Sequence, residues 1–423
     1  MVYVNDFRGA TDSDRIEAAL AARTGDGVVV LTPREADDEP ARDFWRIDRA
    51  ILLPENTIFI VRNCTIRLSD RCRDNFFRTA NCGFGFPDPV PIANVHIHGE
   101  GRAVLRGADH PRATGDSSKM LHAPCPFTEE DLIRYGDWIP AERRAPGKLN
   151  FWDQHNHSYG TDALDPNESH FGDWRGIGVL FANASEFSIA GLSIVESHGW
   201  GISCEACSFG YIRDIRFDAC MSKEIDGMLM NMENQDGIDL RNGCHHIEIS
   251  GISGETGDDM IALTAIVPDQ ETFLPGGSLR TTHVMPNDWT KRERDIHDIL
   301  IRNVTGFSYL CWLLRLLPAN TRIYNVVIDG LIETPHRIDP SYGGTLLLGD
   351  GGNYGKNCPD SMRNISISHV VCSSSSAVTL AGFMRDSCIT DVINRNPGCR
   401  AIRVVRENGA VSVAMSGIVQ AEE

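Results

Sequence analysis

Short runs that alternate apolar and polar residues recur along the chain, and each ends near a glycine, asparagine or aspartate. This is the pattern of β-strands that stop at corners. The expected strands include residues 28–31, 57–61, 64–68, 95–98, 187–190, 211–217, 246–249, 298–301, 325–328, 364–370 and 402–405. Few long helical patterns are visible, which argues against Rossmann and TIM-barrel folds. The pattern predicts an all-β solenoid, with a pair of β-sandwiches as the second choice.

The first 31 residues predict a cap for the open end of this solenoid. Thr11-Asp-Ser-Asp14 is an N-cap signal, and Ile16, Ala19 and Leu20 give the following helix an apolar face. A short amphipathic helix ahead of the first strand covers backbone groups that would otherwise pair with other chains. We therefore expect a single domain over residues 1–423, with the cap at residues 1–31.

Two stretches lack the alternating pattern and are expected to be inserted loops, at residues 108–175 and 265–294. The first contains Trp152 and the basic residues Arg143, Arg144 and Lys148. Aromatic faces stack on sugar rings, so we expect this insertion beside a binding groove, with Trp152 contacting substrate. It could equally pack on the flank of the solenoid or on another subunit, which leaves a homo-oligomer open. The second insertion carries the charge run 291–294, which is either a solvated face or a wall of the groove.

Composition narrows the classes of partner and the cellular compartment. The chain has 58 acidic and 40 basic residues, a net charge of −18, which argues against nucleic acid and anionic membranes as partners. No apolar run reaches transmembrane length. The 13 cysteines show no repeated metal spacing, and Cys204-x-x-Cys207 stands alone. His155-x-His157 lacks a third ligand, so we expect no metal. Reduced thiols and no visible leader favour the cytoplasm, or an extracellular location if a leader has been removed.

Two acidic clusters stand out, Asp236 with Asp239 and Asp258 with Asp259. Asp236 and Asp258 are 22 residues apart, about one coil of a parallel β-helix, so the clusters are expected side by side. Strands in a sheet lie about 4.8 Å apart, close to the spacing that two-carboxylate sugar chemistry requires. Each aspartate alone fits an ordinary turn, but crowded acids repel one another and raise a pKa.

Strand alternation refines where the first cluster sits. It places Asp239 on the face of Gly237, opposite Ile238 and Leu240, so we expect open space beside Asp239. The same alternation would turn Asp236 inward. Asp236 can therefore take part in chemistry only if it sits at a corner.

The pair N-x-D-G-I-D and G-D-D-x-I-A-L, one coil apart, resembles glycoside hydrolase family 28, the polygalacturonase-like enzymes. The strong match spans about 70 residues, 197–264. The resemblance implies a right-handed parallel β-helix of about ten coils, which acts as an inverting hydrolase without cofactor or metal. It implies that Asp258 protonates the glycosidic oxygen and that Asp236 and Asp259 activate water. Three further residues are implied as contacts to substrate: Asp239, His198 and Trp200.

Two parts of the family pattern are missing, the tripeptides G-H-G and R-I-K. The next coil, residues 307–317, contains Arg315 as its one charged residue, which could replace either tripeptide and bind substrate. Arg322-Ile-Tyr324 is the nearest echo of R-I-K. R-I-K binds uronate carboxylates in the family. Because it is incomplete here, the sequence favours neither galacturonate nor a neutral glycan as the substrate.

The expected partner is an oligosaccharide or polysaccharide of plant or microbial origin. A lyase or sugar transferase on the same fold is one alternative. A lyase would require a basic Arg or Lys and often calcium. A non-catalytic glycan-binding β-helix is the other alternative.

Overall fold

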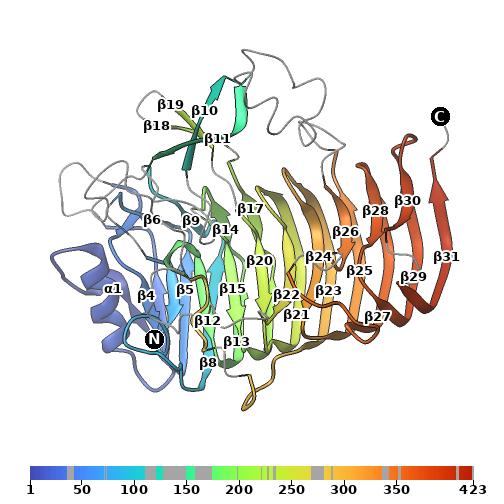
Figure 1. The fold of residues 1–423 in the computed structure, drawn as a ribbon. Coiled ribbons are helices and arrows are strands. Elements are labelled where there is room, and N and C mark those ends of the chain that lie inside the picture. Colours follow the sequence, from blue (N-terminus) through green and yellow to red (C-terminus); the bar gives the residue numbers. More distant parts are fainter. Residues whose placement is uncertain are drawn as a thin grey trace.

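The computed structural model is a long solenoid of parallel strands with a helix at its N-terminal end (Figure 1). The coils wind as a right-handed parallel β-helix, as the sequence predicts. The structure describes residues 1–35, 42–70, 72, 74–109, 121–126, 149–157, 174–197, 199–220, 222–225, 228–231, 235–267, 281–286, 289–335, 343–350, 354–405 and 409–421.

Two parallel sheets run the length of the solenoid, as far as these described residues show. The first sheet has 17 strands: β1 (Val2–Tyr3), β2 (Val28–Leu31), β3 (Trp45–Ile47), β5 (Thr57–Arg62), β6 (Thr65–Leu68), β8 (Ile92–Glu100), β9 (Val104–Arg106), β13 (Ala184–Ala190), β14 (Ser193–Val195), β16 (Ser208–Arg213), β17 (Arg216–Asp218), β21 (His245–Thr256), β23 (Ile296–Ser308), β25 (Ile323–Glu333), β27 (Met362–Cys372), β29 (Met384–Asn394) and β31 (Ala410–Gln420).

The second sheet has 10 strands, one from each coil: β4 (Ile51–Leu53), β7 (Phe77–Thr79), β12 (Val179–Ala182), β15 (Ile202–Glu205), β20 (Ile238–Arg241), β22 (Ile261–Ile266), β24 (Trp312–Ala319), β26 (Gly344–Leu348), β28 (Ser376–Leu380) and β30 (Arg400–Val404). This number agrees with the ten coils expected from the sequence.

Stacks of identical side chains fill the interior of the coils. Ile249, Ile301, Ile328 and Ile367 pair in register on successive strands of the first sheet, and each is buried. Because side chains alternate between the two faces of a strand, the inward-facing apolar residues of the coils form one continuous core. Burial of this apolar area is the main favourable contribution to folding.

Residues with positive φ bend the first sheet at the same position of successive coils. Asp214, Asn303 and His369 have φ of 53°, 56° and 55° in this corner column. The bend at Asp214 divides residues 208–218 into β16 and β17, so the single strand expected over 211–217 is wrong. The corner makes each coil three-sided, with the second sheet as one side.

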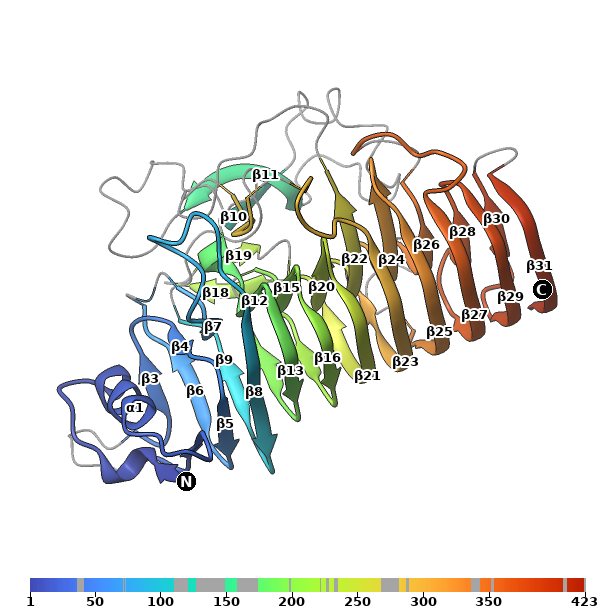
Figure 2. The same cartoon turned by 90° about the horizontal axis from the view of Figure 1, so that it is seen from below.

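Helix α1 (Asp12–Ala21) covers the N-terminal end, where the sequence predicts a cap (Figure 2). Thr11 and Asp14 form a capping box, because the Thr11 side chain accepts the Asp14 N–H and the Asp14 carboxylate accepts the Thr11 N–H. A short 3₁₀ turn, η1 (Val4–Asp6), precedes the helix. In the described part of the chain, no helix has the length and apolar character needed to cross a membrane.

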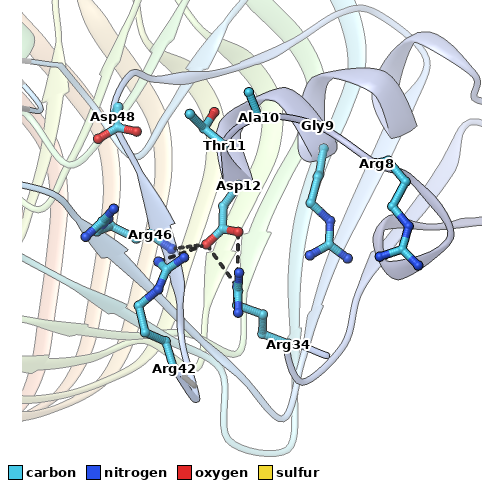
Figure 3. Close-up of a pocket in the computed structure, with 10 residues that line it drawn as sticks. Arg8, Gly9, Ala10, Thr11, Asp12, Arg34, Arg42, Arg46 and Asp48 are labelled. Carbon is cyan, nitrogen blue, oxygen red and sulfur yellow. Dashed lines mark hydrogen bonds and ion pairs between the residues drawn. The ribbon is translucent and has the colours of Figure 1, made fainter. Parts of the chain in front are cut away.

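Residues of the cap and of the first coils together line an arginine-rich hollow of about 250 Å³ (Figure 3). Its charged groups fix the cap to the coils. At its centre the buried Asp12 accepts hydrogen bonds from Arg34 Nε at 3.0 Å, Arg42 Nη1 at 3.3 Å and the Arg46 backbone N–H at 2.8 Å. The Arg15 guanidinium lies 4.8 Å from the ring centre of Trp45. These charges are therefore used to hold α1 against the strands.

A small antiparallel sheet projects from the solenoid, in the order β11-β10-β19-β18 (Figure 1). It contains β10 (Leu121–Pro126), β11 (Leu149–His157), β18 (Ser222–Ile225) and β19 (Met228–Asn231). The first insertion is thus not a plain loop, since it contributes two strands. The hairpin β18–β19 ends shortly before Asp236, so this sheet is linked by a short connection to the acidic clusters. A second 3₁₀ turn, η3 (Trp174–Gly176), leads back into the coils.

The C-terminal end of the solenoid is uncapped in the described residues. Val411, Met415, Ile418 and Val419 of β31 are all exposed. Edge strands of this kind are places where sheets meet other chains. The homo-oligomer that the sequence leaves open remains a prediction.

The described cysteines are free thiols, and most of them are buried. Cys204, Cys207 and Cys244 stack in the interior of successive coils, and each is fully buried. Burial raises the pKa of Cys244 well above its ordinary value. These thiols therefore act as small apolar side chains of the core.

Candidate active site

The two acidic clusters lie on adjacent coils at the start of β20 and β22. Ile238 pairs with Ile261, so this coil takes 23 residues, one more than the spacing of Asp236 and Asp258. The Gly237 N–H donates to the Asp259 carbonyl at 2.9 Å, which sets Asp236 beside Asp259 in register. The alignment of Asp236 with Asp258 expected from the spacing is therefore off by one residue.

Asp236 sits at a corner, before the first residue of β20. The carbonyl of its neighbour Gln235 accepts the N–H of Gly257 at 3.0 Å and of Asp258 at 3.4 Å. The Gln235 side chain is fixed in turn, because its Nε2 donates to the Ser197 carbonyl at 2.7 Å. The segment before Asp236 is thus held directly against the segment that carries Asp258 and Asp259.

Two groups of the next coil hold Asp259. Its Oδ1 accepts the backbone N–H of Trp312 at 2.9 Å, and its Oδ2 accepts Arg315 Nη1 at 3.3 Å. Burial raises the pKa of Asp259 to about 6; the Arg315 charge opposes this shift, and the like charge of Asp258 adds to it. Asp259 therefore keeps its proton to a higher pH than an ordinary aspartate does.

Arg315 forms an ion pair with Asp259, with Nη1 3.3 Å from Oδ2. It lies on β24, in register with Ala262 of β22, which itself pairs with Asp239. Burial works against the Arg315 cation, but the surrounding anionic groups, Asp259 first among them, together outweigh it and raise the pKa of Arg315. The Arg315 guanidinium also lies 5.6 Å from the ring centre of Tyr354. Arg315 is therefore paired with an acid of the site, and this accounts for an arginine among leucines.

Cys311 lies where the next coil approaches Asp258. One ligand atom each of Asp258, Asp259 and Cys311 falls within 4.8 Å of the others, a spacing that could hold a cation. Burial raises the pKa of the Cys311 thiol well above its ordinary value, and the charges of Asp258 and Asp259 raise it further. Because thiolates are the metal-binding form of cysteine, this set is a weak one for a metal. Cys311 thus lies on the coil that corresponds to the one carrying G-H-G in family 28 enzymes.

Asp239 projects from the outer face of the second sheet, while Ile238 and Leu240 point into the core. The open space expected beside it is not present, since Asp239 is only 2 % exposed. Gly237 does not create space there. A Cβ at residue 237 would lie 2.3 Å from the Met260 carbonyl oxygen, so glycine is required by close packing.

A second polar group, which the sequence analysis missed, lies on the neighbouring coils. Glu205 is fully buried on β15, and its carboxylate accepts His283 Nδ1 at 2.6 Å and the N–H groups of Val284 and Met285 at 3.0 and 3.3 Å. Arg241 Nη1 donates to the Thr282 carbonyl at 2.8 Å. Glu205 therefore anchors part of the second insertion to the outer face of the second sheet.

Protonation of this group follows from its burial. Burial lowers the pKa of His283 to about 4, and the Arg241 charge adds to this effect. Burial alone would raise the pKa of Glu205, but His283 and Arg241 lower it to about 2. A neutral His283 can donate from Nδ1 to Glu205 and accept from Arg241 at Nε2. The sequence feature that could have revealed this polar group is Arg241, a charged residue two positions after Asp239 and therefore on the same face of the strand.

Trp200 belongs to the same group. The Arg241 guanidinium lies 5.1 Å from its ring centre, and the half-buried indole packs against a small apolar cluster that contains Val284, Met285 and Trp289. The charge run 291–294 is mostly exposed, and Arg292 pairs with Asp88 at 2.8 Å. Of the second insertion, the apolar part thus packs over Glu205 and Arg241, and the charge run forms a solvated face.

We expect Glu205→Ala to release Val284 and Met285 from the second sheet. Hydrogen bonds to a charged group contribute about 1.5–3 kcal/mol each, so amide exchange at Val284 and Met285 should accelerate roughly ten- to one-hundred-fold. Hydrogen exchange followed by mass spectrometry measures this. Glu186→Ala, at an exposed corner of the first sheet, is the control and should leave these amides unchanged. Equal protection in Glu205→Ala would contradict the anchoring role.

Two of the expected substrate contacts cannot be placed. His198 lies outside the described residues. Trp152 lies on β11, whose backbone is described and whose side chains are not. Arg322, in the nearest echo of R-I-K, follows the end of β24, whereas Trp312 at the other end of that strand bonds to Asp259. The echo therefore does not belong to the acidic site.

Comparison with solved structures finds similarity to proteins of several kinds. A tailspike protein of an E. coli bacteriophage, solved with a pentasaccharide, is 11 % identical with a TM-score of 0.55; the match covers 98 % of this chain and 65 % of the tailspike chain. A polygalacturonase from Erwinia carotovora is 11 % identical with a TM-score of 0.48, covering 99 % and 93 %. The surface adhesin PfbA of Streptococcus pneumoniae is 9 % identical with a TM-score of 0.47, covering 100 % and 93 %.

Sequence comparisons add nothing to this result. No family model matches the chain, and no curated protein matches it. The likeness to the tailspike shows a shared fold and no more. Fold and site together define a parallel β-helix with a cluster of buried carboxylates on two adjacent coils.

Proposed function

We propose that the protein is an inverting glycoside hydrolase of the family 28 type. Asp258 is the general acid, and Asp236 and Asp259 activate the attacking water. The observation that supports this proposal best is the register of the two coils, which sets Asp236 beside Asp259 and next to the turn that carries Asp258. Hydrolysis with inversion requires one protonated and one ionised carboxyl at the same bond. The raised pKa of Asp259, to about 6, is in keeping with one proton held within this cluster in weakly acidic solution.

The substrate is a glycan, and we infer that it is neutral rather than a polyuronate. Arg315 is the cation beside the acids, and its charge is already matched by Asp259. The coil after the acids lacks R-I-K, the tripeptide that binds the uronate carboxylate in the family. The phage tailspike of the same fold was solved with an oligosaccharide, which is in keeping with a glycan ligand on the outer face of such a solenoid.

The ion pair between Arg315 and Asp259 also argues against a lyase. A lyase requires a basic side chain that gives up its proton to become a proton acceptor. The pKa of Arg315 is raised by its pairing with Asp259, so Arg315 stays protonated. The carboxyls of Asp236, Asp258 and Asp259 are then the groups of the proposed site that transfer protons.

Product analysis tests the proposal directly. The protein is incubated with neutral and pectic oligosaccharides, and new reducing ends, ultraviolet absorbance of unsaturated uronates and the anomer formed are followed by colorimetry, spectroscopy and NMR. We expect new reducing ends with inverted configuration and no absorbance. Absorbance would establish a lyase, and retained configuration would overturn the assigned roles. Cleavage of pectic oligosaccharides alone would contradict the neutral substrate.

One observation favours a second candidate, a non-catalytic glycan-binding protein. The acids Asp236, Asp239, Asp258 and Asp259 are only 7 %, 2 %, 8 % and 3 % exposed, so the site resembles a packed polar cluster as much as an open centre. This alternative predicts retention of the protein on an immobilised glycan without any product. Turnover of that same glycan would exclude it.

A further inference from the structure

A cluster of imidazoles lies on the first sheet, away from the acidic site. His245 and His246 begin β21, and His297 and Asp298 lie at the beginning of the next strand, β23. His245 pairs with His297 in register, and their rings stack at 4.9 Å with an angle of 2° between planes. The described part of the chain thus brings three histidines and one carboxylate together from two successive coils.

Two of these residues occupy a column of corner positions with positive φ, in which asparagine is the most frequent residue among the described coils. Its asparagines are Asn56, Asn94, Asn325 and Asn364. Asparagine tolerates this conformation, and its amide can bond to the next coil, as from Asn364 Nδ2 to Asn325 Oδ1 at 3.1 Å. The corner thus carries short hydrogen-bonded runs of asparagine.

His246 and Asp298 occupy this column on adjacent coils, with φ of 53° and 54°. Asn325 donates to Asp298 Oδ1 at 3.0 Å, so the hydrogen-bonded run that starts at Asn364 reaches Asp298. The next position in the column is His246. A carboxylate and an imidazole on adjacent coils can therefore face the same point.

The donor atoms are close enough to share an ion. Asp298 Oδ2 lies 2.7 Å from His297 Nδ1 and 3.8 Å from His246 Nε2, and ligand atoms of the three residues all lie within 4.8 Å of one another. Ligands of a tetrahedral zinc ion, bound at about 2.0–2.1 Å, are separated by about 3.4 Å. Because His246 is exposed and Asp298 half-buried, small side-chain rotations bring them to this spacing.

Asp298 and His246 each have a second hydrogen-bond partner, and a carboxylate lies near the second ring nitrogen of His297. Asn325 holds Asp298 Oδ1, His245 Nδ1 lies 2.9 Å from His246 Nδ1, and Glu293 Oε2 lies 3.7 Å from His297 Nε2. Metal-binding histidines characteristically use their second ring nitrogen in this way. The arrangement therefore has both a donor set and its supporting groups.

We propose that His246, His297 and Asp298 form a binding site for a divalent transition-metal ion, of which zinc fits best. Two imidazoles and one carboxylate suit zinc, with water as a fourth ligand. The ion would tie β21 to β23 where the chain returns from the second insertion, which separates the end of β22 at Ile266 from the start of β23 at Ile296. This site is independent of the proposed hydrolase activity.

The alternative is that the cluster only continues the hydrogen-bonded run of the corner and the ring stack. Asparagine substitutions separate the two possibilities, because asparagine is the most frequent residue of this column among the described coils. His246→Asn and Asp298→Asn keep a residue suited to positive φ, and both remove a strong ligand. His369→Asn is the matched control, since His369 also has a positive φ of 55° and faces the carboxylates of Asp329 at 2.7 Å and Asp391 at 4.0 Å, but does not belong to the three-residue set.

The experiment is isothermal titration of metal-stripped full-length protein with zinc chloride, together with thermal melts with and without zinc. We expect one saturable site in the wild type and in His369→Asn, and affinity at least tenfold weaker in His246→Asn and Asp298→Asn. Zinc should raise the melting temperature of the first two proteins only. No saturable binding in the wild type, or equal binding in all four proteins, as the cysteines alone would give, would overturn the proposal.

Discussion

Asp258→Asn is expected to lower the rate of glycan hydrolysis by about a hundred- to ten-thousand-fold, the usual contribution of a general acid. Asparagine matches aspartate in shape, and its carbonyl can still accept the Asp259 N–H that Asp258 Oδ1 accepts at 2.9 Å. The turn that presents Asp259 is therefore retained. What is lost is the proton that the carboxyl would give to the glycosidic oxygen.

The measurement is the initial rate of release of reducing ends on the best substrate of the wild type. Asp48→Asn, which changes an acid of the first coil far from the acidic site, is the control and should retain the wild-type rate. A melt followed by circular dichroism shows whether Asp258→Asn is folded. If a folded Asp258→Asn cleaves as fast as the wild type, the acidic cluster is not the active site.

The fold could be predicted because it depends on a simple repeated requirement. Each coil must turn apolar residues such as Ile249 and Ile301 inward and stop at a corner, so the alternation and the corner residues are visible in the sequence. The cap was also visible, since Thr11 and Asp14 form a local capping motif. The small sheet was missed because its strands pair across a long separation, as His122 does with Asn231.

The site could be predicted in part. Asp236, Asp258 and Asp259 were found because acids recur one coil apart, but the spacing alone could not settle whether Asp258 or Asp259 faces Asp236. The pairing of Arg315 with Asp259 depends on register between two coils. Glu205 and His283 are 78 residues apart and meet only because the second insertion folds back onto β15. No local pattern encodes such a contact.

Arg315→Met should make the stability of the protein more sensitive to pH. The folded pKa of Asp259, about 6, is already above its ordinary value near 3.8, so the folded state holds its proton more tightly than the unfolded state. The free energy of unfolding therefore falls as pH rises between these values. Loss of a neighbouring opposite charge raises a carboxyl pKa by a further 1–3 units or so, so the fall continues to higher pH in the variant.

The expected result is a difference between variant and wild type that grows with pH. Each unit of pKa corresponds to about 1.4 kcal/mol, so the variant should lose about 1–3 kcal/mol more than the wild type between pH 4 and pH 8. Urea unfolding at several pH values measures it, and Arg315→Lys, which keeps the cation, should follow the wild type. Any activity that depends on the protonated pair should also persist to higher pH in Arg315→Met. A loss of stability equal at all pH values would mean that Arg315 acts by packing and does not control the Asp259 proton.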